Sequence, residues 1–310
     1  MDQLIDRKEL TKQQRLVRRG MIGLAIVLIG GLIVSWAVAG FLVRPQLGEI
    51  GDPPDELHAA KFSVDSDSGS SIAGWHIQGV PGRGVIVLLH GVRGNRRAML
   101  DRATSLHQLG FSIVMIDFQS HGESAGNRIT LGHLEKHDAR AAVEFARREH
   151  PGEKIGVIGV SLGGASALLA SPLNIDALVI ESVYSNVDAA IGNRVRAVIG
   201  PLATLPTKLL VWQLYPRLGI RASDLRPADC IAQTGCPTLV VSGKRDVHTT
   251  VIETRAMFAA AQEPKSLWLV DDAAHVDLYH HNAASYQQHV FRFLEQSMHN
   301  VLLPDSDNTP

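Results

Sequence analysis

The sequence predicts an α/β protein whose mostly parallel sheet is covered by helices on both faces. Three observations support this prediction. Short Val/Ile/Leu-rich runs alternate with longer segments of helical periodicity from residue 84 onwards. The runs are apolar at consecutive positions, as in strands that are buried on both faces of a parallel sheet. The chain of 310 residues is 45% hydrophobic and 20% charged, which is enough for one large buried core.

The elements follow one another in a regular order along the chain. Residues 61–64 and 71–78 flank the turn-rich segment 65–70, which predicts a hairpin at one edge of the sheet. Further strands are expected at residues 84–89, 111–117, 154–160, 177–181, 238–242 and 266–270. Helices are expected between them at residues 96–109, 131–148, 162–170, 251–261 and 283–296. The folded domain is therefore expected to span residues 60–297.

Residues 183–229 break this alternation, because they are too long for a crossover loop and too apolar for a linker. We expect a helical insertion that caps the carboxyl edge of the sheet. The alternative is a set of helices that pack away from that edge.

The beginning of the chain carries a membrane-targeting pattern. Residues 21–43 contain no charged residue, and a helix of about twenty such residues spans a bilayer. Six basic residues precede this transmembrane helix, so the positive-inside rule places residues 1–20 in the cytoplasm. Residues 44–59 are then expected to be a linker to an extracytoplasmic domain. The alternative is an export signal cleaved at Ala37-Val38-Ala39, although the apolar segment continues beyond that site.

Composition limits the classes of partner. The formal net charge of −1 gives no general attraction to nucleic acid. The two cysteines, Cys230 and Cys236, are expected to be small apolar residues, with a disulfide as the alternative. Their spacing indicates no metal site, and no organic cofactor is implied. The tail, residues 298–310, is expected to be disordered.

The most informative motif is Gly159-Val160-Ser161-Leu162-Gly163, which lies between an expected strand and an expected helix. A serine on so tight a turn needs glycines beside it, because a Cβ there would collide with the neighbouring strand and helix. This geometry exposes the Ser161 hydroxyl above the sheet. It also leaves the N–H of Leu162 free at a helix N-terminus, as acyl transfer to a serine requires.

A serine nucleophile needs a general base and an acid that orients it. His275 follows the last expected strand, and Asp246 follows the strand before it, so the order serine, acid, histidine is that of hydrolases on open α/β sheets. Glu181 and Asp272 are alternative acids. Among the other histidines, His248 lies on the acid-bearing loop, and His280 and His281 are expected on the surface of the last helix.

An oxyanion formed at Ser161 needs two backbone donors. One is the N–H of Leu162. The second is expected on the loop that follows the strand at residues 84–89, where His90-Gly91 makes the turn and Val92 supplies the N–H. His90 itself is expected to anchor this loop rather than to act as a second base.

Together these motifs resemble the alpha/beta-hydrolase superfamily, and most closely its serine-aminopeptidase-like and monoglyceride-lipase-like branch. The resemblance covers about residues 60–297 and implies an eight-stranded, mostly parallel sheet with helices on both faces and a helical cap. No aromatic or basic substrate-binding residue can be matched in the insertion. The residues that carry the resemblance are His90-Gly91, residues 117–124, residues 159–163, residues 243–246 and His275.

The resulting expectation is a membrane-anchored serine hydrolase that cleaves carboxylic esters or thioesters of acyl or lipid-like small molecules. It would use Ser161, His275 and Asp246, and it would contact the bilayer through residues 21–43. Two alternatives stay open. The same residues serve an acyltransferase when an alcohol or amine accepts the acyl group, and the fold also suits a non-catalytic membrane-tethered binding domain.

Overall fold

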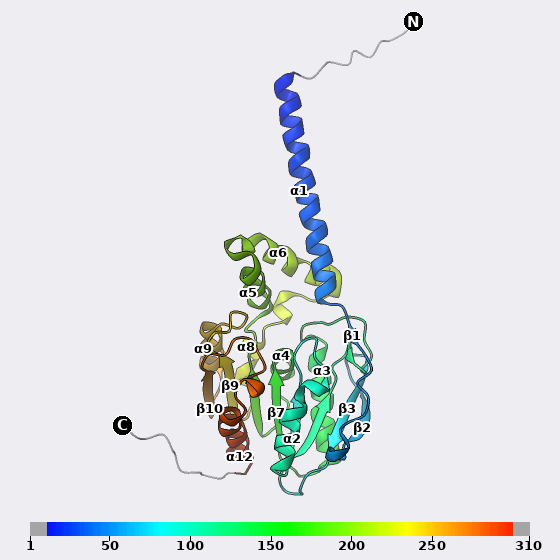
Figure 1. Cartoon of the computed structure of the whole chain (residues 1–310), viewed down its shortest axis with the longest axis vertical. Coiled ribbons are helices and arrows are strands. Elements are labelled where there is room, and N and C mark those ends of the chain that lie inside the picture. Colours follow the sequence, from blue (N-terminus) through cyan, green and yellow to red (C-terminus); the bar gives the residue numbers. More distant parts are fainter. Residues whose placement is uncertain (1–10, 300–310) are drawn as a thin grey trace, which may run out of the picture. The chain divides into compact units, whose positions relative to one another are not determined.

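The computed structural model describes residues 11–299 and divides the chain into two compact units, one up to Leu42 and one from Val43 onwards. The first unit contains a single long helix, α1 (Lys12–Leu42), of 31 residues (Figure 1). Its mean hydropathy reaches 2.5, and its length and composition suit a membrane span. The helix begins nine residues before the predicted segment 21–43, and residues 1–10 lie outside the described part of the chain.

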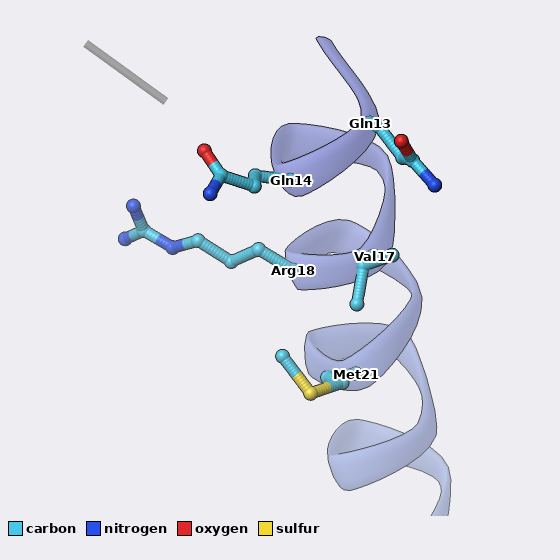
Figure 2. A pocket seen from close by; sticks show the side chains of 5 residues that line it. All are labelled: Gln13, Gln14, Val17, Arg18 and Met21. Atoms are coloured by element: carbon cyan, nitrogen blue, oxygen red, sulfur yellow. The ribbon is translucent and has the colours of Figure 1, made fainter. Parts of the chain in front are cut away.

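The N-terminal turns of α1 differ in character from the rest of the helix. Gln13, Gln14 and Arg18 lie there beside Val17 and Met21 around a shallow hollow (Figure 2). Polar and basic side chains therefore come before the uncharged segment. This is the order expected where a helix leaves an aqueous phase and enters a bilayer.

The second unit is built on an eight-stranded sheet with the strand order β10-β9-β8-β7-β4-β5-β3-β2 (Figure 1). β2 pairs with β3, and β3 with β5, in antiparallel fashion, whereas the other neighbours are parallel. The predicted mostly parallel eight-stranded sheet is confirmed. The strands are β2 (Ala60–Asp65), β3 (Ser71–Ile77), β4 (Val85–Leu89), β5 (Ser112–Ile116), β7 (Ile155–Val160), β8 (Ala177–Glu181), β9 (Thr238–Gly243) and β10 (Lys265–Val270).

Helices cover both faces of this sheet, because successive strand residues point to opposite sides. Val85, Val87 and Leu89 of β4 belong to one core, together with α3 (Glu135–Glu149), α4 (Leu162–Leu169) and α9 (Val251–Ala260). Ile86 and Leu88 belong to the other core. The helices on that side are α2 (Leu100–Gln108), α10 (Leu278–His281), α11 (Ala283–Tyr286), the π-helical turn η6 (Gln287–Phe291) and α12 (Arg292–His299).

The insertion between β8 and β9 is helical, as predicted. Its apolar residues form a small core of their own around Val187, Leu214, Ile220 and Leu225. Several other apolar side chains of the insertion stay exposed, Val198 and Leu202 most of all. The elements are α5 (Val187–Ile199), η3 (Gly200–Ala203), α6 (Thr204–Trp212), α7 (Leu214–Leu218), η4 (Ala222–Asp224), α8 (Pro227–Cys230) and η5 (Ile231–Gln233).

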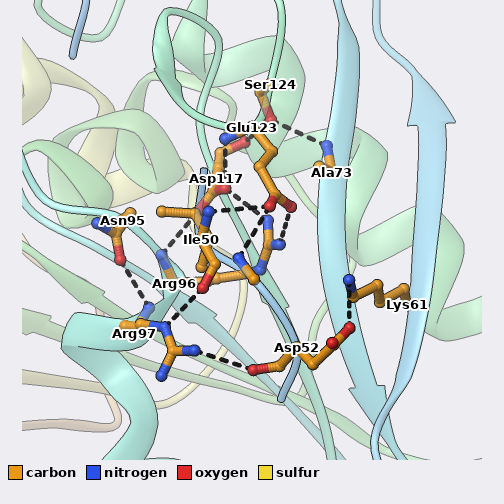
Figure 3. Close-up of polar contacts among 11 residues, drawn as sticks. Ile50, Asp52, Lys61, Ala73, Asn95, Arg96, Arg97, Asp117, Glu123 and Ser124 are labelled. Carbon is orange, nitrogen blue, oxygen red and sulfur yellow. Dashed lines mark hydrogen bonds and ion pairs between the residues drawn. The ribbon is translucent and has the colours of Figure 1, made fainter. Parts of the chain in front are cut away.

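The segment expected to be a linker is hydrogen-bonded to the domain along residues 43–52. β1 (Gln46–Leu47) pairs in parallel with β6 (His121–Gly122). The N–H groups of Ile50 and Gly51 donate to Glu123 at 2.9 and 3.1 Å. Arg97 donates from its side chain to the carbonyl of Ile50 at 2.9 Å (Figure 3). We call residues 43–52 the strap; the short helical turn η1 (Asp55–Leu57) follows it.

Two smaller expectations concern the cysteines and the tail. The thiols of Cys230 and Cys236 are both free, so the alternative of a disulfide is not realised. Burial raises the pKa of Cys236 to about 12, in keeping with its role as a small apolar residue. The expected tail overlaps the last residues of α12, which extends to His299, and residues 300–310 lie outside the described part of the chain.

Candidate active site

Ser161 occupies the sharp turn between β7 and α4. Its backbone angles are φ 49° and ψ −105°, in the left-handed half of conformational space that side chains rarely adopt. A Cβ added to Gly159 would lie 2.5 Å from the nitrogen of Gly164, and one added to Gly163 would lie 2.2 Å from the carbonyl oxygen of Leu89. Both glycines are thus needed for the helix to pack this closely on the sheet.

The backbone around Ser161 is held from both sides. Its N–H donates to the carbonyl of Glu181 at 2.7 Å, and its own carbonyl accepts from Ala165 at 2.9 Å. The residue is mostly buried, with 7% of its surface exposed. Leu162 begins α4, and the first N–H groups of a helix have no acceptor within it. The turn therefore offers a hydroxyl and a backbone donor at the carboxyl end of a central strand.

The structure brings Asp246 and His275 together. Asp246 lies on the loop after β9, His275 on the loop after β10, and the Nδ1 of His275 donates to the Oδ2 of Asp246 at 2.7 Å. The same carboxylate accepts from the N–H groups of His248 and Thr249 and from the Thr249 hydroxyl, at 2.8, 2.9 and 2.5 Å. These donors lower the pKa of Asp246 to about 2, although burial acts in the opposite direction. The carboxylate is ionised and fixed in orientation.

The two alternative acids are engaged elsewhere. Glu181 is fully buried and accepts from Arg102 at 2.9 Å and from the hydroxyl of Tyr286. Asp272 is exposed and pairs with Arg245 at 2.6 Å. Of the three acids considered from the sequence, Asp246 is the one paired with His275.

Arg102 connects Glu181, which holds the backbone of Ser161, to the loop that carries His275. Besides its contact with Glu181, its guanidinium donates to Asp277 at 2.9 Å and to the Tyr286 hydroxyl at 3.1 Å. Asp277 lies two residues after His275 and caps α10 by accepting from the N–H of His280 at 3.0 Å. The carbonyl of Glu181 is the acceptor for the N–H of Ser161. No local sequence pattern indicates this network, because its members are far apart in the chain.

The loop after β4, with Val92, lies next to Ser161. A Cβ built on Gly91 would be 3.8 Å from the Cβ of Ser161. His90 is buried, donates from Nδ1 to the carbonyl of Gly91 at 2.7 Å and accepts from the N–H of Phe118 at 3.1 Å. Burial and the nearby His121 lower the pKa of His90 to about 3, so the ring is neutral. His90 therefore anchors the loop, as expected.

A second histidine fixes the far side of this loop. The Nε2 of His121 accepts from the N–H of Arg93 at 3.2 Å, and its Nδ1 donates to the carbonyl of Gln119 at 3.0 Å. Next to it, the N–H of Arg96 donates to Asp117 at 2.7 Å, and the Arg96 side chain pairs with Asp117 and Glu123 (Figure 3). The motif at residues 117–124 thus holds the loop that carries Val92.

The insertion contributes polar residues that the sequence did not reveal. Asn193 of α5 donates from its side chain to the carbonyl of His248 at 3.2 Å and to Glu253 at 2.8 Å. The ring of His248 meets that of His275 edge-on, with centroids 5.4 Å apart. Arg194 follows Asn193 directly. No sequence signal singled out this arginine, because helical periodicity does not indicate which loop a helix will contact.

The strand order of the sheet and the strained turn at Ser161 are those of the alpha/beta-hydrolase fold. Residues 81–227 match the family model described as serine aminopeptidase, S33. The chain has the alpha/beta-hydrolase fold, and the family model covers a little under half of its residues.

Curated relatives are similar to most of this chain, and solved structures share its fold. The protein Rv2307c of Mycobacterium tuberculosis is 29% identical over 82% of this chain and 86% of its own length. YqkD of Bacillus subtilis is 26% identical over 78% of this chain and 81% of its own length. An esterase of Pyrococcus furiosus superimposes with a TM-score of 0.69 at 22% identity, covering 83% of this chain and 98% of the esterase. A serine hydrolase without a lid from Xanthomonas campestris superimposes with a TM-score of 0.54 at 18% identity, covering 77% of this chain and 95% of that hydrolase.

Proposed function

We propose that this hydrolase is a serine esterase or thioesterase in which Ser161 is the nucleophile, His275 the general base and Asp246 the residue that orients it. The observation that carries the proposal is the 2.7 Å hydrogen bond from the Nδ1 of His275 to an ionised Asp246. It leaves the Nε2 of His275 for the serine hydroxyl. Ser161 stands on the strained turn after the central strand β7, at the same edge of the sheet.

In the proposed reaction, the Ser161 Oγ attacks the carbonyl carbon while His275 takes the hydroxyl proton. The N–H groups of Leu162 and Val92 stabilise the oxyanion, and removing such a donor costs about 3–4 kcal/mol in other hydrolases. As the tetrahedral intermediate collapses, His275 gives the proton to the leaving alcohol or thiol. Water then attacks the acyl-enzyme by the same route, which releases the acid and restores Ser161.

We further propose that α1 anchors the enzyme in a membrane, with the N-terminus in the cytoplasm and the hydrolase domain on the other side. The uncharged residues 21–43 and the preceding basic residues support this topology. Together with the exposed apolar residues of the insertion, the anchor favours acyl or lipid-like substrates. Resistance of the full chain to extraction from membranes by alkaline carbonate is the expected result; release into the soluble fraction would contradict the anchor.

The test of the active site uses the full chain in detergent micelles. Wild type is expected to hydrolyse 4-nitrophenyl butyrate and to react with a fluorophosphonate probe. Ser161→Ala should lose both activities, whereas Ser171→Ala, which removes a serine after α4, should keep them. Labelling that persists in Ser161→Ala would contradict the proposed nucleophile. Product analysis with added alcohols or amines separates hydrolysis from acyl transfer.

A further inference from the structure

Two polar side chains near Asp246, Arg194 and His248, make few or no hydrogen bonds. Arg194 is partly buried, and its Nη1 donates to the carbonyl of Ala190, one turn earlier in α5, at 2.9 Å. Within residues 11–299, its guanidinium makes no other hydrogen bond and no ion pair. In the same part of the chain, neither ring nitrogen of His248 has a hydrogen-bond partner, although Nδ1 is buried. A buried polar atom without a partner, such as the Nδ1 of His248, is rare in folded proteins and needs an explanation.

Both residues belong to the surroundings of the candidate active site. His248 lies two residues after Asp246, and its ring meets the ring of His275 edge-on. The side chain of Asn193 bonds the carbonyl of His248, so α5 is fixed to this loop at the residue next to Arg194. Arg194 of the insertion therefore lies close enough to Asp246 and His248 to interact with both electrostatically, and His248 lies on the loop after β9.

The nearby acids do not neutralise Arg194 by direct contact. Asp246 is occupied by His275, Thr249 and the N–H of His248. Glu253 accepts from Asn193 and from both the N–H and the hydroxyl of Thr250. The pKa of Arg194 is lowered, because burial outweighs the attraction of Asp246, Tyr184 and Glu253. The pKa of His248 is also lowered, by burial first and then by the charge of Arg194. An anion bound between Arg194 and His248 would stabilise the charged form of each side chain and so oppose both decreases in pKa.

We propose that Arg194, assisted by His248, binds a carboxylate carried by the substrate, so that the enzyme prefers esters whose acyl chain ends in a negative charge. The inference rests on the proposed serine-hydrolase function and names its substrate class. A planar guanidinium matches a carboxylate with two parallel hydrogen bonds. A single cation beside a neutral imidazole suits this singly charged group better than a phosphate, which carries more charge and more acceptors.

The experiment compares matched charged and neutral substrates. The full chain in detergent is assayed with the mono-4-nitrophenyl esters of succinate, glutarate and adipate, and with the methyl esters of the same three compounds. For the preferred chain length, wild type is expected to show a kcat/KM at least about tenfold higher for the charged ester than for its neutral partner. Arg194→Gln should lower kcat/KM for that charged ester by about ten- to hundredfold and change the neutral ester less than about twofold.

Two controls keep the outcomes apart. Arg196→Gln removes an exposed charge from the same helix and should leave the ratio of charged to neutral rates unchanged. Fluorophosphonate labelling of Ser161 reports the proposed catalytic machinery independently of substrate charge. Two results would overturn the carboxylate site and leave the serine-hydrolase proposal standing. One is a labelled wild type that favours the neutral esters, and the other is an Arg194→Gln variant that loses equal activity on both series. A wild-type chain that is not labelled would overturn the serine-hydrolase proposal as well.

Discussion

Replacing Arg102 with methionine should destabilise the hydrolase domain and disturb the candidate active site together. The guanidinium is buried and makes side-chain bonds to Glu181, Asp277 and Tyr286 at 2.9, 2.9 and 3.1 Å. Without it, the buried carboxylate of Glu181 keeps the Tyr286 hydroxyl as its remaining side-chain partner. Removing one partner of a buried ion pair costs about 3–5 kcal/mol, because the other charge stays buried and uncompensated.

The assay is thermal unfolding of the full chain in detergent, followed by far-ultraviolet circular dichroism. For a domain of this size, such a loss corresponds to a decrease in Tm of roughly 6–20 °C. The matched control is Arg83→Met, which removes a partly exposed pair with Glu295 at 2.9 Å and should cost less than about 1 kcal/mol. Glu181→Gln in the Arg102→Met background should recover part of the loss, because it removes the stranded charge.

The activity of the same variants tests whether Arg102 positions the histidine loop. Below its Tm, Arg102→Met should lower kcat for a 4-nitrophenyl ester more than it raises KM, because Asp277 loses its anchor two residues after His275. A Tm within about 2 °C of wild type, or a double variant whose loss equals the sum of the single losses, would refute the reasoning.

Two further predictions concern Asp246 and the strap. Because the pKa of Asp246 is lowered to about 2, its pairing with His275 adds stability that is fully present above the unfolded value of 3.8 and is lost as the pH falls through about 2. We therefore expect the acidic limb of the pH profile of kcat/KM to have a slope of one above about pH 4, because Asp246 stays ionised there. A slope of two in that range would contradict this. Glu123→Gln should weaken the bonds to Ile50 and Gly51 and accelerate cleavage after the exposed Glu49 by a glutamyl endoproteinase several-fold, whereas Glu144→Gln, on the exposed face of α3, should not. Equal cleavage rates in the two variants would show that Glu123 does not hold the strap.

Local patterns in the sequence were sufficient to predict the sheet and several positions at its carboxyl edge. Buried parallel strands are apolar at consecutive positions, and the elbow at Ser161 needs small neighbours such as Gly159 and Gly163, so both leave a mark in adjacent residues. The placement of Asp246 and His275 after successive strands followed from the rule that such strands end at one edge. The roles assigned to these residues stay predictions until the serine is labelled.

The sequence by itself determined the α/β class, the apolar N-terminal segment and the order in which polar residues follow the strands. Only the tertiary structure decided which distant residues meet: Glu181 pairs with Arg102, the strap pairs with residues 121–123, and Asn193 bonds the loop of His248 from α5. The physical reason is range. Periodicity and turn chemistry act between near neighbours in the chain, whereas a buried charge takes whichever partner the packing of distant elements brings within hydrogen-bonding distance.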